Sequence, residues 1–98
     1  MRVKWLRTAL RNLDEAAEWI ARDNPKAAAG FVIAVRETVA RLAAYPAMGK
    51  AGRVAGVREM PAQGYPYLLP YRVVGEELQV LRVFHVRQQR PGEWGPSN

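Results

Sequence analysis

Four arginines and a single histidine are the residues of this chain whose types suit chemistry on a phosphate group. They lie in or beside segments of strand-like composition in the second half of the chain: Arg58, Arg72, Arg82, Arg87 and His85. A guanidinium group binds two phosphate oxygens at once, and an imidazole that titrates near neutrality acts as a general acid or base. The set would suit metal-free cleavage of RNA, in which a neighbouring 2′-hydroxyl attacks the phosphodiester.

The same residues have a simpler interpretation. Arg72 and Arg82 would pair with Glu59 or with backbone carbonyls, and His85 would be a hydrogen-bonded strand residue. For His85 the sequence favours this simpler interpretation, whereas it favours contact with a partner for at least one arginine. Charge at strand positions where apolar residues would pack better is expected at functional surfaces.

The sequence lacks the residues that nucleophilic catalysis, metal binding or cofactor binding would require. The chain has no cysteine and one serine, Ser97, near its end, so a Ser or Cys triad is implausible. His85 stands alone, and the aspartates fall on or near the first expected helix, so no metal site is predicted. No cofactor motif is found either, because the glycine-rich stretch 47–56 contains no GKS or GKT and follows no strand.

Charge is the first indication of a partner. The 98 residues make one domain and carry a net charge of +6, with a pI near 10.3. Such a chain is attracted to nucleic acid, to ribosomes or to an acidic protein. No apolar run approaches the roughly 18 residues of a membrane span, and the N-terminus has no signal-peptide pattern. We therefore expect a cytoplasmic protein without membrane contact.

Two helices are expected in the first half, after a short strand at 2–5. Apolar residues recur at helical spacing from Ala9 to about Arg22, with Thr8 as the expected cap. A second helix is expected from Pro25 to about Ala44, because Asn24 is a good N-cap and proline fits the first helical position. Gly30 lies in a run of small residues, which predicts that the first helix approaches the second closely there.

Strands are expected in the second half. They are a short strand at 57–60 and a hairpin with arms at 65–74 and 78–87. Because prolines are tolerated at sheet edges and rarely inside, the first arm is expected to start irregularly, and an edge left open there, or an uncovered sheet face, could accept an extended partner. The hairpin as a whole is expected to supply the central pair of strands. The order β-α-α-β-β-β predicts an α+β fold with a helical hairpin packed on a small, mainly antiparallel sheet. Residues 1–90 would form the domain and 91–98 a C-terminal tail.

Over residues 1–90 the chain resembles the RelE/ParE superfamily of toxins from bacterial type II toxin–antitoxin systems. Each matching piece is degenerate, but their order and spacing together are specific. The pieces are Trp5 with Ala9 and Leu13, Asp23-Asn24-Pro25, Tyr45-Pro46-Ala47-Met48-Gly49, Gly52-Arg53, Val57-Arg58-Glu59, Tyr71-Arg72-Val73 and Leu81-Arg82-Val83-Phe84-His85. The Gly-Arg, Val-Arg-Glu and Leu-Arg-Val-Phe-His pieces look more like the ParE branch.

The resemblance implies a toxin that inhibits DNA gyrase and is neutralised by an acidic, ParD-like antitoxin with a ribbon-helix-helix domain. The two would form a hetero-oligomer that meets operator DNA only through the antitoxin. The RelE branch implies the alternative, a ribosome-dependent mRNA endoribonuclease, for which Arg58, Arg72, Arg82, His85 and Arg87 would be the catalytic candidates. If the chain belongs to the ParE branch, no residue is expected to be catalytic. The expected partner-binding residues are then Arg58, Arg72, Arg82, Arg87, Tyr67 and Tyr71.

Overall fold

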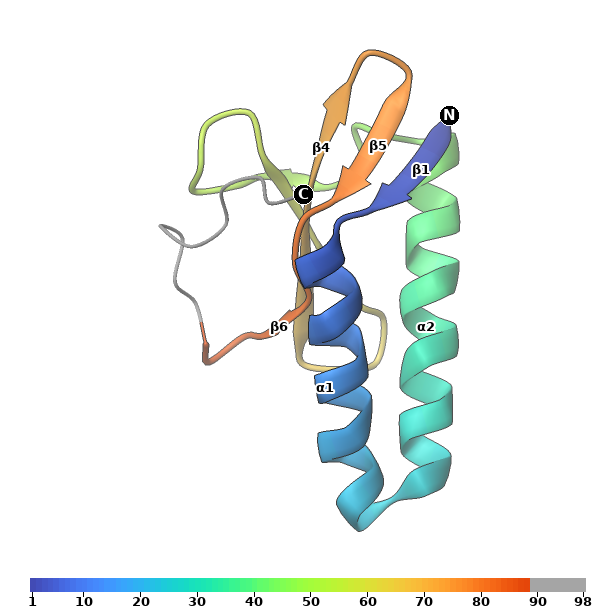
Figure 1. The fold of residues 1–98 in the computed structure, drawn as a ribbon. Coiled ribbons are helices and arrows are strands. Elements are labelled where there is room, and N and C mark those ends of the chain that lie inside the picture. The colour runs from blue at the N-terminus through green and yellow to red at the C-terminus, as the bar shows by residue number, and fades with distance from the viewer. Residues whose placement is uncertain (89–98) are drawn as a thin grey trace.

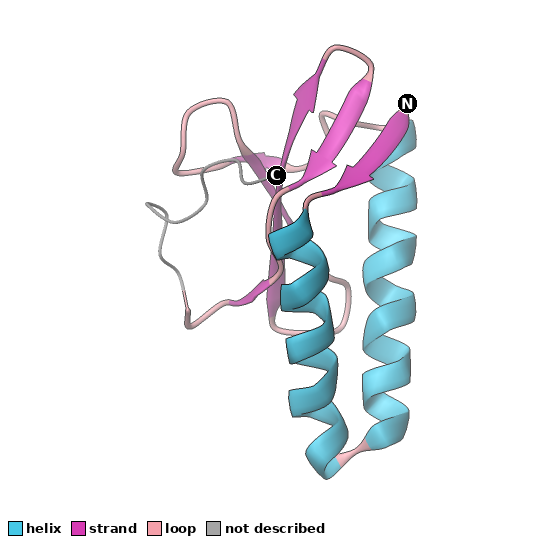
Figure 2. Ribbon diagram, in the orientation of Figure 1, coloured by secondary structure: helices cyan, strands magenta, loops and turns pink. Residues whose placement is uncertain are grey.

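Two long helices lie together on one face of a small sheet (Figures 1 and 2). The structure is a computed structural model that describes residues 1–88, so the expected tail at 91–98 lies outside the described residues. The elements are β1 (Arg2–Trp5), α1 (Arg7–Asp23), α2 (Pro25–Ala44), β2 (Lys50–Ala51), β3 (Arg58–Pro61), β4 (Tyr67–Val74), β5 (Glu77–Val80) and β6 (Phe84–His85). The α+β class and the helical hairpin on a sheet are confirmed.

Local capping sets the start of α2, as predicted. The Asn24 side-chain oxygen accepts the Ala27 N–H at 3.0 Å, and Pro25 occupies the first helical position. The start of α1 was predicted wrongly, because the helix begins at Arg7 and its N-cap is Leu6, which makes no side-chain cap bond. Leu6 is positioned instead by the sheet, since its N–H donates to the Val80 carbonyl at 3.1 Å and its side chain is buried.

The reason predicted for Gly30 was also wrong. A Cβ at this position would lie 2.6 Å from the Tyr65 hydroxyl oxygen, and no atom of α1 lies within 4 Å of it. The Tyr65 hydroxyl donates to the Ala27 carbonyl at 3.2 Å. The small residue therefore makes room for a tyrosine from the segment before β4, and not for the first helix.

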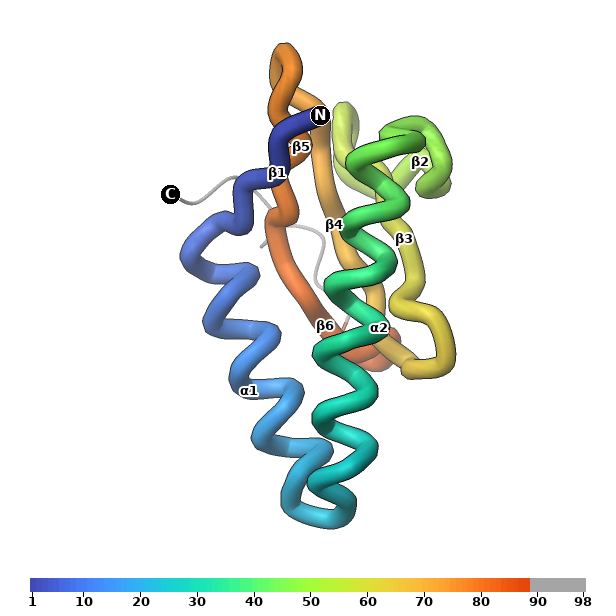
Figure 3. Tube along the Cα trace, turned by 90° about the vertical axis from the view of Figure 1, so that its right-hand side faces the viewer, coloured from blue at the N-terminus to red at the C-terminus, as the bar shows by residue number. Residues whose placement is uncertain are grey.

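The sheet runs in the order β1-β5-β4-β3-β2, and β6 pairs with β4 beyond the end of β5. The pair β1–β5 is parallel and the other described pairs are antiparallel. Helix α2 crosses in front of the strands when the molecule is turned by 90° (Figure 3). The sheet is therefore mainly antiparallel, as predicted, but its first strand joins it in parallel.

The second arm of the hairpin is not one strand. It breaks after Val80 and resumes at Phe84. At the break the Leu81 N–H donates to the Pro70 carbonyl at 2.9 Å, but proline has no N–H to return the bond. The break also lets Val83 join Val80 in the same core, whereas an unbroken strand would place their side chains on opposite faces. The continuous strand predicted for 78–87 is therefore wrong.

The sheet is packed on both faces, unequally. Its helix-covered face contributes Leu69, Tyr71, Leu78 and Val80 to the main core, together with Phe31, Val35, Val39 and Leu42 of α2. A separate cluster of Leu6, Val57 and Leu81, with Val54 against it, covers part of the other face. No helix among residues 1–88 is long and apolar enough to cross a membrane.

Candidate functional site

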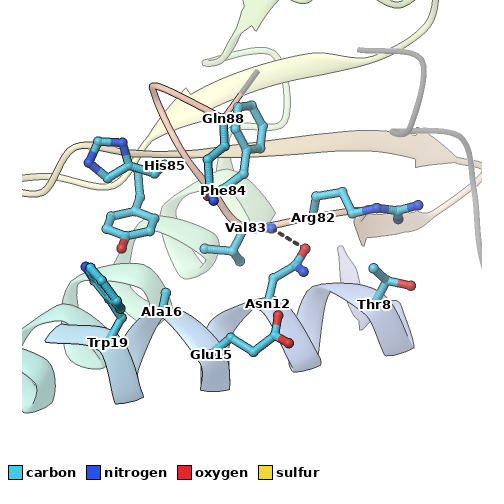
Figure 4. A pocket seen from close by; sticks show the side chains of 11 residues that line it. Thr8, Asn12, Glu15, Ala16, Trp19, Arg82, Val83, Phe84, His85 and Gln88 are labelled. Carbon is cyan, nitrogen blue, oxygen red and sulfur yellow. Dashed lines mark hydrogen bonds between the residues drawn. The ribbon is translucent and has the colours of Figure 1, made fainter. Parts of the chain in front are cut away.

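A groove of about 810 Å³ runs between α1 and the broken C-terminal arm of the hairpin (Figure 4). One wall is a stripe of α1, and the other is formed by the strand break and by β6. Its lining residues are Thr8, Asn12, Glu15, Ala16, Trp19, Tyr67, Arg82, Val83, Phe84, His85 and Gln88. The groove is thus where the strand break meets the first helix.

Asn12 holds the two walls together. Its side-chain oxygen accepts the Val83 N–H at 3.2 Å, the interaction dashed in Figure 4. This bond supplies a partner to a backbone group that has left the strand ladder. Asn12 was not predicted as a site residue. An asparagine inside an amphipathic helix is nevertheless a signal, because its side chain competes for backbone hydrogen bonds.

His85 lies in the groove wall directly opposite Tyr67 in the β4–β6 ladder. The two rings meet edge to face, with centroids 5.2 Å apart. The His85 Nδ1 atom accepts the Arg87 N–H at 3.1 Å, so the neutral ring carries its proton on Nε2. A neutral His85 therefore offers the groove a donor. A base at Nε2 would require the proton to move to Nδ1 and the Arg87 bond to break.

Tyr67 contributes a second donor to the same wall. Its side chain is largely buried, and desolvation raises the pKa of the phenol above its ordinary value. The phenol consequently remains protonated at neutral pH. With Tyr67 and His85 both in donor form, the groove wall offers two hydrogen-bond donors to acceptor groups of a partner.

Arg82 points along its own chain at the mouth of the groove. Its Nη1 atom donates to the Leu81 carbonyl at 2.6 Å, and the side chain is partly buried. Arg87 is exposed just beyond β6. Of the residues predicted for a site, the structure therefore gathers Tyr67, Arg82 and His85 at the groove and places Arg87 near them along the chain.

Arg58 and Arg72 do not join this group. Arg58 pairs with Tyr71 in the ladder and shares its helix-covered face, where the guanidinium donates to the Gly49 carbonyl at 2.8 Å. Arg72 follows Tyr71 along β4 and so points to the other face. There its Nε donates to the Gln79 side chain at 2.8 Å. The two arginines therefore lie on opposite faces of the sheet.

Tyr71 is an internal residue. It is fully buried, and its hydroxyl donates to the Pro46 carbonyl at 2.6 Å and accepts the Gly49 N–H at 2.9 Å. A Cβ at Gly49 would lie 2.6 Å from that hydroxyl, so the glycine permits the close approach. In this conformation Tyr71 supports the loop after α2 and presents no surface to a partner.

Trp19 is another groove residue that was not predicted as part of a site. It is 64% exposed, and the Arg22 guanidinium lies 5.0 Å from its ring centroid. A tryptophan on the polar side of an amphipathic helix is the signal that was available for it. Elsewhere in residues 1–88, no group of three His, Cys, Asp or Glu side chains is arranged to hold a metal ion.

Both the sequence and the fold of this chain are similar to those of known proteins. The family model for the ParE toxin of the type II toxin–antitoxin system parDE matches residues 3–90. A protein of Sinorhizobium fredii (strain NBRC 101917 / NGR234) that bears the name toxin Y4kP is 41% identical over 90 residues, covering 92% of this chain and 93% of its own. A chain from the chromosomal ParDE TA system of P. aeruginosa superimposes with a TM-score of 0.77 at 32% identity, covering 87% of this chain and 95% of its own. The chain therefore belongs to the ParE toxin family of type II toxin–antitoxin systems.

Proposed function

We propose that this ParE-family toxin acts by binding DNA gyrase and inhibiting it, and that it carries out no catalysis of its own. The family match over residues 3–90 is the observation that carries the proposal. The separation of Arg58 from Arg72 across the sheet supports it, because phosphoryl-transfer chemistry needs its cationic groups around one phosphate. The donor state of His85 is consistent with it as well.

The partner that neutralises the toxin would be an acidic, ParD-like antitoxin with a ribbon-helix-helix domain. The net charge of +6 favours such a partner, because complementary charge speeds encounter and sets specificity. The two chains would form a hetero-oligomer in the cytoplasm, and operator DNA would be contacted by the antitoxin.

The groove is the surface that we assign to a macromolecular partner. Tyr67 and Arg82 line it, and Arg87 is exposed beside β6. Arg58 and Arg72 would serve contacts on the two faces of the sheet, each with donors beyond the bonds described above. Tyr71 would contribute indirectly, because its hydroxyl holds the loop after α2.

A supercoiling assay tests the proposal directly. Purified toxin would be added to gyrase, relaxed plasmid and ATP, and we expect a dose-dependent loss of supercoiling that an excess of antitoxin reverses. A parallel reaction in a translating extract would be probed for cleaved mRNA. Normal supercoiling together with cleaved mRNA would contradict gyrase inhibition and would show that the toxin is a ribonuclease.

A further inference from the structure

The outer edge of β1 presents backbone groups that have no partner in the described sheet. β1 is the end strand and pairs with β5 alone, and Figure 1 shows it beyond β5, on the side away from β4. The N–H groups of Arg2 and Leu6 donate to the carbonyls of Glu76 and Val80, both at 3.1 Å. Because backbone groups alternate in direction along a strand, those of Val3 and Trp5 point to the outer edge.

The other margins of the sheet are less suited to strand addition. At the far end, β2 has two residues, and the Gly52 N–H that follows is bonded to the Val57 carbonyl at 2.7 Å. On the side of β6, the strand break faces α1 and is bonded to Asn12. Within residues 1–88, β1 is therefore the longest strand with a free edge.

The side chains of β1 define what would fit beside it. Val3 and Trp5 lie opposite Leu78 and Val80, so they continue the apolar row of the helix-covered face, and Val3 is still 39% exposed. Arg2 and Lys4 lie on the other face. Both side chains are exposed to solvent, and neither makes an ion pair within residues 1–88. An added strand would thus meet apolar groups on one face and two cations on the other.

We propose that the edge of β1 receives an extended segment in which aliphatic and acidic residues alternate. Its backbone would bond to Val3 and Trp5, its aliphatic side chains would lengthen the row beside Val3, and its carboxylates would face Arg2 and Lys4. A second copy of this chain does not fit, because antiparallel pairing of two β1 strands would bring the cations of both copies together. The inference rests on the proposed function, in that the segment would belong to the antitoxin.

Amide hydrogen exchange in the toxin–antitoxin complex tests the contact at the backbone. The probe is the antitoxin encoded beside the toxin, purified with it by co-expression and compared with free toxin by NMR. We expect the Val3 and Trp5 amides to exchange about tenfold more slowly in the complex, as two new hydrogen bonds imply. The Leu6 amide, already bonded to β5, is the internal reference, and unchanged exchange at Val3 and Trp5 would overturn the inference.

Two sets of variants test the same contact by affinity. Val3→Pro removes an outward N–H without touching the bonds to β5, and the Kd for the antitoxin should rise about tenfold while gyrase inhibition is retained. If Val3→Pro fails to fold, the double variant Arg2→Glu/Lys4→Glu gives the test, with the exposed pair Arg11→Glu/Lys26→Glu as its control of equal charge change.

The outcomes separate the two proposals. Weaker binding by the β1 double variant than by its control supports the strand addition. Equal binding by the two, in a complex that forms normally, overturns the strand addition and leaves the antitoxin partnership standing. If the wild-type toxin forms no complex with the antitoxin, both the partnership and the inference drawn from it are wrong.

Discussion

At the scale of single residues, a few polar atoms decide how irregular segments attach to the sheet. The Tyr71 hydroxyl satisfies two backbone groups of the loop after α2, and Asn12 satisfies the Val83 N–H at the strand break. A buried backbone group left without a partner costs about 1–3 kcal/mol. These side chains therefore support the groove and the sheet without contacting any partner themselves.

Tyr71→Phe should lower the free energy of unfolding by about 1–3 kcal/mol, because the Pro46 carbonyl and the Gly49 N–H lose their partner. Urea denaturation followed by circular dichroism measures the change. Tyr45→Phe is the matched control, since Tyr45 is 69% exposed and should lose nothing. Equal stability of the two variants would show that the Tyr71 hydroxyl does not hold the loop.

Asn12→Ala should destabilise the protein by about 1 kcal/mol and increase amide exchange at Val83, because the acceptor of that N–H is removed. Asn12→Asp keeps an acceptor oxygen at the same position and should preserve the protection of Val83. Unaltered Val83 exchange in Asn12→Ala would mean that the strand break persists without this hydrogen bond.

At the scale of elements, the packing of neighbours overrides local preference. Glycine inside α2 lowers helix propensity by about 1 kcal/mol relative to alanine. It is nevertheless compatible with the fold, because the Tyr65 hydroxyl occupies the space that a Cβ would need. The Tyr65 ring also meets Phe31 edge to face, with centroids 5.4 Å apart, so the tyrosine ties the segment before β4 to the helix.

The effect of Gly30→Ala on the free energy of unfolding should therefore change sign when the Tyr65 hydroxyl is removed. In the wild-type background we expect a loss of about 1–3 kcal/mol from overpacking against Tyr65. In a Tyr65→Phe background the oxygen is gone, and the same substitution should stabilise by about 1 kcal/mol through helix propensity. Urea denaturation of the four proteins completes the double-mutant cycle.

The control for that cycle is Ala40→Gly, at an exposed position of the same helix. It should cost about 1 kcal/mol in either background, because it reports propensity alone. If Gly30→Ala behaves identically with and without the Tyr65 hydroxyl, steric contact is not the reason for the glycine.

At the scale of the whole molecule, a basic chain distributes its cations over several surfaces. Arg58 lies on the helix-covered face, Arg72 on the opposite face and Arg82 at the groove. A catalyst would need these groups together, whereas a binding protein gains from charge spread over the area that a partner covers.

His85→Ala should consequently leave most of the gyrase inhibition and growth inhibition intact, because inhibition by binding requires no proton transfer and the variant removes only one hydrogen-bond donor of the groove wall. Supercoiling assays and growth after induction without antitoxin measure the two effects. Circular dichroism of the purified variant checks that it is folded. Loss of toxicity in a folded His85→Ala variant would favour a ribonuclease.

The sequence indicated neither β2 nor the break between β5 and β6. What the amino-acid sequence by itself determined is the class of fold, the bounds of α2 and the succession of one strand, two helices and then further strands. These depend on signals within a few residues: Asn24 caps its own helix, Pro25 fits the first turn, and Gly75 adopts the positive φ of 60° that the hairpin turn requires. The net charge also follows from the sequence alone, and so does the resemblance to the toxin family, which the comparisons confirm.

Only the tertiary structure decided which charged residues meet. The face that an arginine occupies depends on strand register, and the break after Val80 depends on Pro70 and Asn12, which lie far away in the chain. The parallel pairing of β1 with β5 joins the two ends of the domain and leaves one edge open. Because these contacts form between distant segments, no local pattern contains them, and they determine where partners can bind.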